Sequence, residues 1–311
     1  MRVVEVPAYG GPEVLRLSER PTPQPQAGLV RVRVAATTVN QADLKIRSGA
    51  AAGRLGELAP PFVLGFDFAG TLIDDAPHLP AGTVVAGFLP WFELGTGQGT
   101  YAEIVRVDPN WLAPVPEGVD LVRAASVPLS AQTAQQALDL LQLPDNSTVF
   151  VTGAGGVVGR FAVQHAAARG LHVIALTGTA EEHDLRELGA GHTVPRGAPD
   201  GITAHVLRLA PGGVDGILDT ALLGDPLLPA LRDNGSFVSA TQARVPAPAR
   251  GIQVSAVHGT PDGAQLKEIL KRLATGELTT RVAGVLPLEQ AVDAHRRAEA
   301  GGLPGRLVLT L

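Results

Sequence analysis

In the N-terminal third of the chain, apolar and polar residues alternate in short runs. Valine occupies every second position of Val30–Val34, which is the period of a strand with one buried face. Similar runs at 84–88 and 101–105 predict two more strands, and the glycines between 95 and 99 predict a turn that separates them. This part of the chain is therefore predicted to be a small, mostly β domain.

Beyond residue 116 the pattern changes to strands that alternate with helices. Residues 121–143 have apolar side chains at helical spacing, and Thr148–Thr152 is an apolar run typical of a buried strand. Residues 160–169 form an amphipathic stretch, which Gly170 follows at a position typical of a helix end. Further strands are predicted at 171–176, 192–194, 214–218, 236–239, 253–257 and 306–310, and further helices at 262–275 and 287–299. Alternation of this kind predicts a parallel sheet covered by helices on both faces.

These patterns predict an α/β fold with two domains. A length of 311 residues suits two domains of roughly 150 residues each. Residues 1–119, completed by 260–311, are predicted to form the mostly β domain. Residues 120–259 are predicted to form a doubly wound, Rossmann-type dinucleotide-binding domain.

Composition matters mainly for what it excludes. The chain has no cysteine, which excludes disulfides, thiolate nucleophiles, iron–sulfur clusters and Cys-ligated zinc. A net charge of -5 and an aromatic content of 4% oppose nucleic-acid binding, which needs surplus positive charge and stacking surfaces. The N-terminus lacks an apolar signal core, and no apolar stretch approaches the ~20 residues of a membrane span. We expect a cytoplasmic protein that binds neither nucleic acid nor membrane.

The strongest chemical signal is a glycine-rich loop after the strand at 148–152. Gly153, Gly156 and Gly159 have the three-residue spacing of a loop that brings backbone N–H groups and a helix N-terminus close to a pyrophosphate. The alternative, a plain strand-to-helix turn, is opposed by the context, because a strand precedes the loop and a helix and a second strand follow it. The predicted pyrophosphate-binding residues are Gly153, Ala154, Gly155, Gly156, Val157 and Val158.

The residue that ends the second strand of such a unit selects the cofactor. An acid there binds the ribose 2′-OH of NAD and repels a 2′-phosphate. Thr177, Gly178 and Thr179 stand there instead, and these small residues favour NADPH.

The charges nearby point in both directions. Arg196 ends the third strand, where it could bind a 2′-phosphate bidentately or be an ordinary solvated residue. Glu181 and Glu182 occupy the turn after Thr179 and would oppose a phosphate. Arg196 is a candidate cofactor residue, and NADPH is the expected cofactor.

An ordered set of motifs over nearly the whole chain resembles the zinc-free medium-chain dehydrogenase/reductases of the quinone oxidoreductase (zeta-crystallin-like) type. The resemblance implies a GroES-like catalytic domain followed by a Rossmann domain. The segments that carry it are Tyr9–Leu15, Val39–Asp43, Ile46–Gly49, Pro61–Asp67, Gly99–Glu103, Val127–Thr133, Gly153–Gly159, Leu188–Ala190, Val214–Asp219 and Gly305–Leu309.

Zinc-dependent relatives in this superfamily carry Cys where Asn40 stands and His where Phe66 stands. With these residues in place no tetrahedral zinc site can be built, so metal-assisted alcohol oxidation is not expected. The remaining chemistry is hydride transfer to an acceptor that needs little polarisation, such as a quinone or a conjugated enone.

The resemblance also implies the residues of the site. Asn40 and Asp43 are expected to border the nicotinamide and the substrate, and Thr133 to lie against the nicotinamide. Lys45 stands where such quinone reductases often carry Tyr, and it could donate a hydrogen bond to a carbonyl oxygen. Structural turn residues and a solvated charge are the alternative interpretations of Asn40, Asp43 and Lys45.

Three functions remain open. The leading hypothesis is an NADPH-dependent quinone reductase; the second is an NADPH-dependent reductase of activated C=C bonds in enones, alkenals or enoyl thioesters. The proton-donating Tyr of enoyl thioester reductases is missing from residues 50–56, which weighs against thioesters. The third is a non-catalytic, crystallin-like NADPH-binding protein. Relatives pair through the strand that matches 253–257, so a homodimer is expected.

Overall fold

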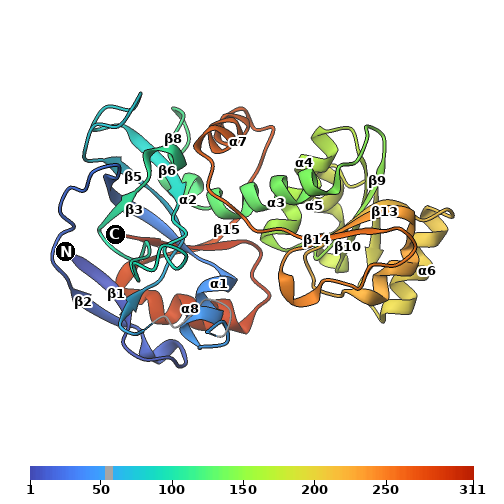
Figure 1. Ribbon diagram of the computed structural model, residues 1–311, viewed down its shortest axis with the longest axis horizontal. Helices are drawn as coiled ribbons and strands as arrows, with labels where there is room; N and C mark the ends of the chain where they lie inside the picture. Colours follow the sequence, from blue (N-terminus) through green and yellow to red (C-terminus); the bar gives the residue numbers. More distant parts are fainter. Residues whose placement is uncertain (53–58) are drawn as a thin grey trace. The chain divides into compact units, whose positions relative to one another are not determined.

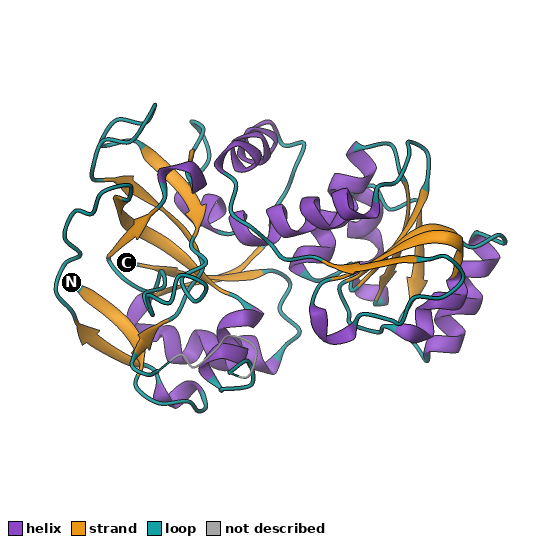
Figure 2. Ribbon diagram, in the orientation of Figure 1, coloured by secondary structure: helices purple, strands orange, loops and turns teal. Residues whose placement is uncertain are grey.

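The computed structural model describes residues 1–52 and 59–311 (Figure 1). The chain divides into two compact units. Unit 1 contains Met1–Gln132 together with Thr260–Leu311, and unit 2 contains Thr133–Gly259. Each unit is built from strands and helices, which Figure 2 distinguishes by colour.

The strands of unit 1 belong to two sheets. They are β1 (Arg2–Val6), β2 (Arg16–Glu19), β3 (Val30–Val39), β4 (Phe62–Val63), β5 (Asp67–Leu72), β6 (Val84–Phe88), β7 (Ile104–Val107), β8 (Ala113–Pro114), β15 (Val282–Pro287) and β16 (Arg306–Thr310). The larger sheet has the order β15-β16-β3-β5-β6-β8, with β7 also paired to β3, and the smaller has the order β2-β1-β4. The predicted mostly β architecture is confirmed.

Strand β3 shows how the sequence pattern becomes a sheet. Val30, Val32 and Val34 are buried, as the alternation predicts. The strand continues to Val39, beyond the alternating run, because its second half pairs with β16, where Val39 lies opposite Leu307. The strand predicted at 84–88 is confirmed as β6, whereas the one predicted at 101–105 begins only at Ile104, in β7.

The helices that belong wholly or partly to unit 1 are α1 (Gln41–Arg47), α2 (Leu121–Ala125), α3 (Pro128–Leu141), α7 (Gly263–Thr275) and α8 (Ala291–Ala300). The helical pattern at 121–143 is split into two helices. Pro128 lacks the N–H of a helix interior and disfavours helical geometry at Val127, so α2 ends and α3 begins there. Single 3-10 turns lie at Pro12–Val14, Pro109–Trp111 and Leu288–Gln290.

Unit 2 is a parallel sheet with helices on both faces, as predicted. Its strands are β9 (Thr148–Thr152), β10 (His172–Thr177), β11 (His192–Pro195), β12 (Val214–Asp219), β13 (Leu231–Ser239) and β14 (Gln253–Ala256). Their order is β11-β10-β9-β12-β13-β14, and every neighbouring pair is parallel. The order reverses at β9, and ligands of open α/β sheets bind at such a switch point.

Three helices pack on the sheet of unit 2: α4 (Val157–Ala168), α5 (Glu182–Glu187) and α6 (Pro199–Leu209). Figure 1 shows α4 and α6 on opposite faces. Short 3-10 segments lie at Thr179–Glu181, Asp225–Ala230 and Gln242–Arg244. None of the helices that the structure describes is both long enough and apolar enough to cross a membrane.

Candidate functional site

In unit 1, Asn40 follows the last residue of β3 and caps the N-terminus of α1. Its backbone N–H donates to Asp43 Oδ2 at 2.8 Å, which closes the first turn of the helix. Asp43 Oδ1 accepts from the backbone N–H of Gly65 at 2.8 Å. The fully buried Asp43 carboxyl therefore joins α1 to the segment between β4 and β5.

The side chain of Asn40 takes part in a second buried cluster, around Asp67. Asn40 Nδ2 donates to Asp67 Oδ2 at 2.9 Å and to Thr38 Oγ1 at 3.1 Å. Thr38 Oγ1 in turn donates to Asp67 Oδ2 at 2.7 Å. The backbone N–H of Leu129 donates to Asp67 Oδ1 at 2.6 Å. The Asp67 carboxylate is thus held by donors from β3, from Asn40 and from α3.

Two buried carboxyl groups and one buried guanidinium set the electrostatics of this region. Burial is the main cause that raises the pKa of Asp43 from 3.8 to about 7, and the charge of Asp67 adds to the rise. The backbone donors and the Arg306 guanidinium act in the opposite direction. Burial lowers the pKa of Arg306, which donates to the Ser130 hydroxyl and to the Val39 carbonyl. Asp43 can therefore hold a proton near neutral pH.

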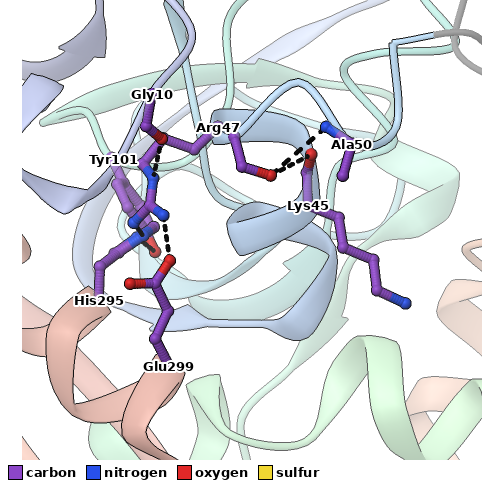
Figure 3. A network of polar contacts seen from close by, with 8 residues as sticks. Gly10, Lys45, Arg47, Ala50, Tyr101, His295 and Glu299 are labelled. Atoms are coloured by element: carbon purple, nitrogen blue, oxygen red, sulfur yellow. Dashed lines mark hydrogen bonds and ion pairs between the residues drawn. The ribbon is translucent and has the colours of Figure 1, made fainter.

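At the other end of α1, Arg47 anchors the helix through three contacts drawn in Figure 3. Its Nε donates to the Gly10 carbonyl at 3.2 Å, its Nη1 to His295 Nδ1 at 3.1 Å, and its Nη2 to the Glu299 carboxylate. His295 Nε2 lies 3.1 Å from the Tyr101 hydroxyl. Because a guanidinium can only donate, Nδ1 of His295 accepts and Nε2 carries the ring proton.

His295 is thereby kept neutral. Burial, and then the charge of Arg47, lower the pKa of His295 from 6.5 to about 3. Burial also raises the pKa of Tyr101 well above its ordinary value. The Arg47–His295–Tyr101 chain is a fixed structural network that joins α1 to α8, and it holds α1 in place.

Lys45 lies on the opposite side of α1 from this network. Its side chain is exposed and extends away from Arg47 and His295 (Figure 3). It does not join the buried cluster of Asn40 and Asp43, although it lies only two residues from Asp43 in the sequence.

In unit 2, the glycine loop connects β9 to α4. Gly153 has φ +58°, a conformation that L side chains rarely adopt. The N–H of Gly156 donates to the Gly153 carbonyl at 2.9 Å. A Cβ on Gly159 would lie 2.3 Å from Gly153 O and 2.7 Å from Ala154 Cα, so a residue without a side chain is needed for α4 to pack this close to the loop.

The carboxyl ends of β9 and β12 are tied together next to the loop. Thr152 Oγ1 donates to the buried Asp219 Oδ1 at 2.5 Å, and the N–H of Ala221 donates to Thr152 Oγ1 at 3.0 Å. Thr220 Oγ1 donates to the Thr152 carbonyl at 2.6 Å. These contacts fix the carboxyl end of β9, from which the glycine loop departs.

At the carboxyl end of β10, the side chain of Glu181 folds back onto the strand. Glu181 Oε2 accepts from Thr177 Oγ1 and from the backbone N–H of Gly178, each at 3.1 Å. Arg196 Nη2 lies 3.8 Å from the same oxygen. A Cβ on Gly155 would lie 3.2 Å from Glu181 Cδ, so the glycine loop and the Glu181 carboxylate are direct neighbours.

The residues of unit 2 fit a dinucleotide. Gly155 and Gly156 precede the twelve-residue helix α4 at the switch point of a parallel sheet, and a helix N-terminus preceded by residues without side chains suits a pyrophosphate. Thr177, Gly178 and Arg196 gather at the end of β10, where the adenosine ribose of a dinucleotide lies in such folds.

The donor set of unit 1 does not fit zinc. Phe66, at the position of a zinc ligand in zinc-dependent relatives, is buried against Trp91 and Phe92, with ring centroids 6.0 and 5.5 Å away. The amide nitrogen of Asn40 is engaged by Thr38 and Asp67. Among residues 1–52 and 59–311, no three His, Cys, Asp or Glu residues gather in a metal-holding group.

Comparisons with known proteins agree with this arrangement. Residues 26–117 match the family model of the alcohol dehydrogenase GroES-like domain, and residues 188–309 match the model of a zinc-binding dehydrogenase. The NADPH-dependent alkenal/one oxidoreductase of Arabidopsis thaliana chloroplasts is 27% identical over 97% of this chain and 77% of its own length. The quinone oxidoreductase of Rattus norvegicus is 33% identical over 62% of this chain and 58% of its own.

Coverage differs widely among the relatives. Erythronolide synthase EryA2 of Saccharopolyspora erythraea is 32% identical over 92% of this chain, but the chain spans only 8% of that synthase. A solved NAD-dependent alcohol dehydrogenase matches the whole chain over 100% of its own length, with 30% identity and a TM-score of 0.84. The chain belongs to the medium-chain dehydrogenase/reductases, in the zinc-free quinone oxidoreductase group. A mycobacterial protein solved with NADPH also matches this reductase over 100% of both chains, with 26% identity and a TM-score of 0.82.

In this medium-chain reductase, most of the site residues predicted from the sequence fall into two groups, one in each unit. Asn40 and Asp43 share one hydrogen-bonded cluster in unit 1. The loop residues, the Thr177–Thr179 turn and Arg196 occupy the carboxyl edge of the sheet in unit 2. Thr133, in α3, is half-buried. The loop at 50–56, which bears on the thioester hypothesis, lies partly outside the described residues.

The sequence did not reveal which side chains contact the predicted site residues of the reductase. Asp67 and Arg306 lie within motifs that carry the family resemblance, but neither was assigned a role. The signal that could have found them is their chemistry, since an Asp after a buried Phe and an Arg in an apolar final strand both need partners inside the fold. Glu181 was identified only as a charge opposed to phosphate, and its contacts with Thr177 and Gly178 were not expected.

Proposed function

We propose that this reductase transfers a hydride from NADPH to a quinone without a metal. Two features of the chain carry the proposal. Unit 2 contains a glycine loop suited to a dinucleotide, and in unit 1 Asn40 and Phe66 stand where zinc-dependent relatives carry ligands. An acceptor reduced without a Lewis acid must stabilise the added charge in its own π system, and quinones do so.

The proposed roles combine the position of each residue in unit 2 with what the family resemblance implies. The loop Gly153–Val158 binds the pyrophosphate, Thr177, Gly178, Thr179 and Arg196 bind the adenosine end, and Thr133 contacts the nicotinamide. NADPH supplies the hydride when bound. Two-electron reduction consumes one quinone, one NADPH and one proton and yields hydroquinone and NADP+, so a proton must reach the acceptor oxygen.

In unit 1, Asn40, Asp43 and Lys45 are proposed to serve the acceptor. Lys45 is exposed, and its ammonium can donate a hydrogen bond to a quinone carbonyl as negative charge develops there. Asp43 is buried, and it acts by holding Asn40 and the first turn of α1 in position. A Lys45→Met variant should therefore raise KM or lower kcat for the quinone while leaving NADPH binding unchanged.

The first experiment measures loss of NADPH absorbance with 1,4-benzoquinone, 9,10-phenanthrenequinone, 2-hexenal and crotonyl-CoA as acceptors. Quinone-dependent oxidation that survives a chelator is the expected result. Arg196→Ala should weaken NADPH binding, whereas Arg208→Ala, which removes an exposed arginine of α6, is the matched control. Tight cofactor binding with no turnover of any acceptor would contradict the proposal and favour a crystallin-like protein.

A second candidate is the reduction of activated C=C bonds. It is favoured by the match to the alkenal/one oxidoreductase of Arabidopsis thaliana over 97% of this chain. Turnover with 2-hexenal or crotonyl-CoA, and none with the quinones, would establish this function in place of the first.

We further propose that the protein is a cytoplasmic homodimer. Residues 1–119 with 260–311 are proposed to act as its catalytic domain, and residues 120–259 as its nucleotide-binding domain. Strand β14 ends the sheet order of unit 2, so its free edge could pair with the same strand of a second copy. Light scattering during gel filtration would measure the mass, and a monomer at all concentrations would contradict the dimer.

A further inference from the structure

The carboxylate of Glu181 occupies an unusual place for an acid in a site expected to take NADPH. It lies against the end of β10, where its Oε2 accepts hydrogen bonds from the Thr177 hydroxyl and the Gly178 N–H. Arg196 Nη2 is 3.8 Å from the same oxygen. Thr177 is fully buried, whereas the Glu181 side chain is one-third exposed, so an incoming ligand can reach the carboxylate.

The groups that surround Glu181 are the ones a phosphate needs. A hydroxyl, a backbone N–H and a guanidinium donate to phosphate oxygens as readily as to a carboxylate oxygen. The Glu181 carboxylate already satisfies the hydroxyl and the N–H before the ligand arrives, and it lies within ion-pair distance of the guanidinium. It also repels a second negative charge at close range.

We propose that Glu181 is a specificity-determining residue that competes with the 2′-phosphate of NADPH for Thr177, Gly178 and Arg196. The proposal rests on the proposed dinucleotide site and deepens it. NADPH has to displace the Glu181 carboxylate, whereas the 2′-OH of NADH can donate to it. Glu181 therefore lowers the preference for NADPH over NADH that the small residues at the end of β10 would otherwise create.

The neighbouring acids do not share this position. Glu182 begins α5, one residue beyond Glu181, and the hydroxyl of Thr177 and the N–H of Gly178 both donate to Glu181 instead. Glu187 ends the same helix on the surface. Each carries the same charge as Glu181, so each is a control for the overall charge of the protein without the local contacts.

The test measures binding of small probes rather than turnover. Calorimetry would give Kd for 2′,5′-ADP, which carries the 2′-phosphate, and for 5′-AMP, which lacks it, with NADPH and NADH titrated in parallel by fluorescence. The Glu181→Gln variant keeps the size and a hydrogen-bond acceptor but loses the charge. Glu182→Gln and Glu187→Gln are the matched controls, and thermal unfolding checks that each variant is folded.

We expect Glu181→Gln to tighten 2′,5′-ADP and NADPH binding by at least about tenfold, with little tightening for 5′-AMP and NADH. The controls should change the 2′,5′-ADP affinity by less than about threefold, as charges beyond direct contact are screened by salt. The gain should be smaller in the Glu181→Gln, Arg196→Gln double variant, because Arg196 released from Glu181 supplies part of it.

Two results would contradict the proposal in distinguishable ways. If both dinucleotides bind and Glu181→Gln leaves the ratio of their Kd values unchanged, or changes it no more than Glu182→Gln does, the competition is wrong and the dinucleotide site stands. If neither dinucleotide and neither probe binds the unaltered protein, the proposed function itself fails. A Glu181→Ala variant repeats the test without any side-chain acceptor.

Discussion

Asn40 and Asp67 are 27 positions apart in the sequence, yet Asn40 Nδ2 donates to Asp67 Oδ2 at 2.9 Å in the core of unit 1. The residue that stands in place of a zinc-binding Cys is therefore a working part of a polar network. Its amide satisfies a buried carboxylate whose other donors come from Thr38 and Leu129.

Removing this amide should destabilise the protein. In Asn40→Ala the Asp67 carboxylate loses one donor, and loss of a partner to a buried polar group costs about 1–3 kcal/mol. Urea unfolding would measure the change in the free energy of unfolding. Gln41→Ala alters the adjacent, exposed residue and should cost less than about 0.5 kcal/mol. Equal stability of the two variants would contradict the network.

Asp43 should make stability decrease as pH rises. The pKa of Asp43 rises from the unperturbed value of 3.8 to about 7 in the folded protein. Between these two pH values the folded state therefore binds more protons than the unfolded state. The stabilisation is fully present below about pH 4 and is lost as pH rises through about 7, with a slope of at most about 1.4 kcal/mol per pH unit.

The contribution of Asp43 is isolated by comparing the protein with its Asp43→Asn variant. The difference in free energy of unfolding should shrink as pH is raised from about 5 to about 8, because only the unaltered protein loses stability there. Asp75→Asn, at an exposed turn of the same unit, is the control variant for the loss of a surface carboxyl group.

His295 should have the opposite effect. Its pKa falls from 6.5 to about 3 on folding, so the unfolded state binds the extra proton between these limits. The stabilisation is present above about pH 6.5 and is lost progressively as pH falls toward 3. His295→Gln can still accept from Arg47 and donate to Tyr101, and it should remove this acid sensitivity.

The measurement is urea unfolding at several pH values between about 4 and 7. The advantage of the unaltered protein over His295→Gln should be largest at the upper end and decrease toward acid. His78→Gln, at an exposed histidine of the same unit, is the control variant for the loss of a surface imidazole. Matching slopes in the unaltered protein and in His295→Gln would refute a neutral, buried His295.

Gly159→Ala should damage the glycine loop. The added Cβ would lie 2.3 Å from the Gly153 carbonyl oxygen, so α4 would have to move away from the loop. We expect a loss of about 1–3 kcal/mol in stability, as for other overpacked sites, and weaker binding of both NADPH and NADH.

Gly201→Ala provides the matched control for Gly159. Gly201 lies in α6 with no atom within 4 Å of an added Cβ, and alanine is the better helix former by about 1 kcal/mol. This variant should be slightly more stable and bind both dinucleotides normally. Thermal unfolding and fluorescence titration measure the two properties, and a loss of binding in Gly201→Ala would make the comparison uninformative about the loop.

The parts of the fold that were predicted from sequence are those with local causes. The strand Thr148–Thr152, the glycine loop and α4 follow one another in the chain, so apolar pattern and glycine spacing identify them together. The helix break before Pro128 also has a local cause, although the helical spacing over 121–143 did not predict it. By contrast, β3 continues to Val39 because it pairs with β16, which lies near the other end of the chain.

The sequence by itself determined the class of chemistry: a contiguous glycine loop between strand and helix, and an absence of cysteine that removes zinc–thiolate sites. Only the tertiary structure decided which side chains meet. Asp67, Arg306 and Ser130 approach the Asn40–Asp43 turn because sheet order and strand register bring distant segments together. Glu181 turns toward Thr177 and Gly178 because the 3-10 turn after β10 carries its carboxylate back to the end of the strand. Such contacts depend on geometry that spacing along the chain does not encode.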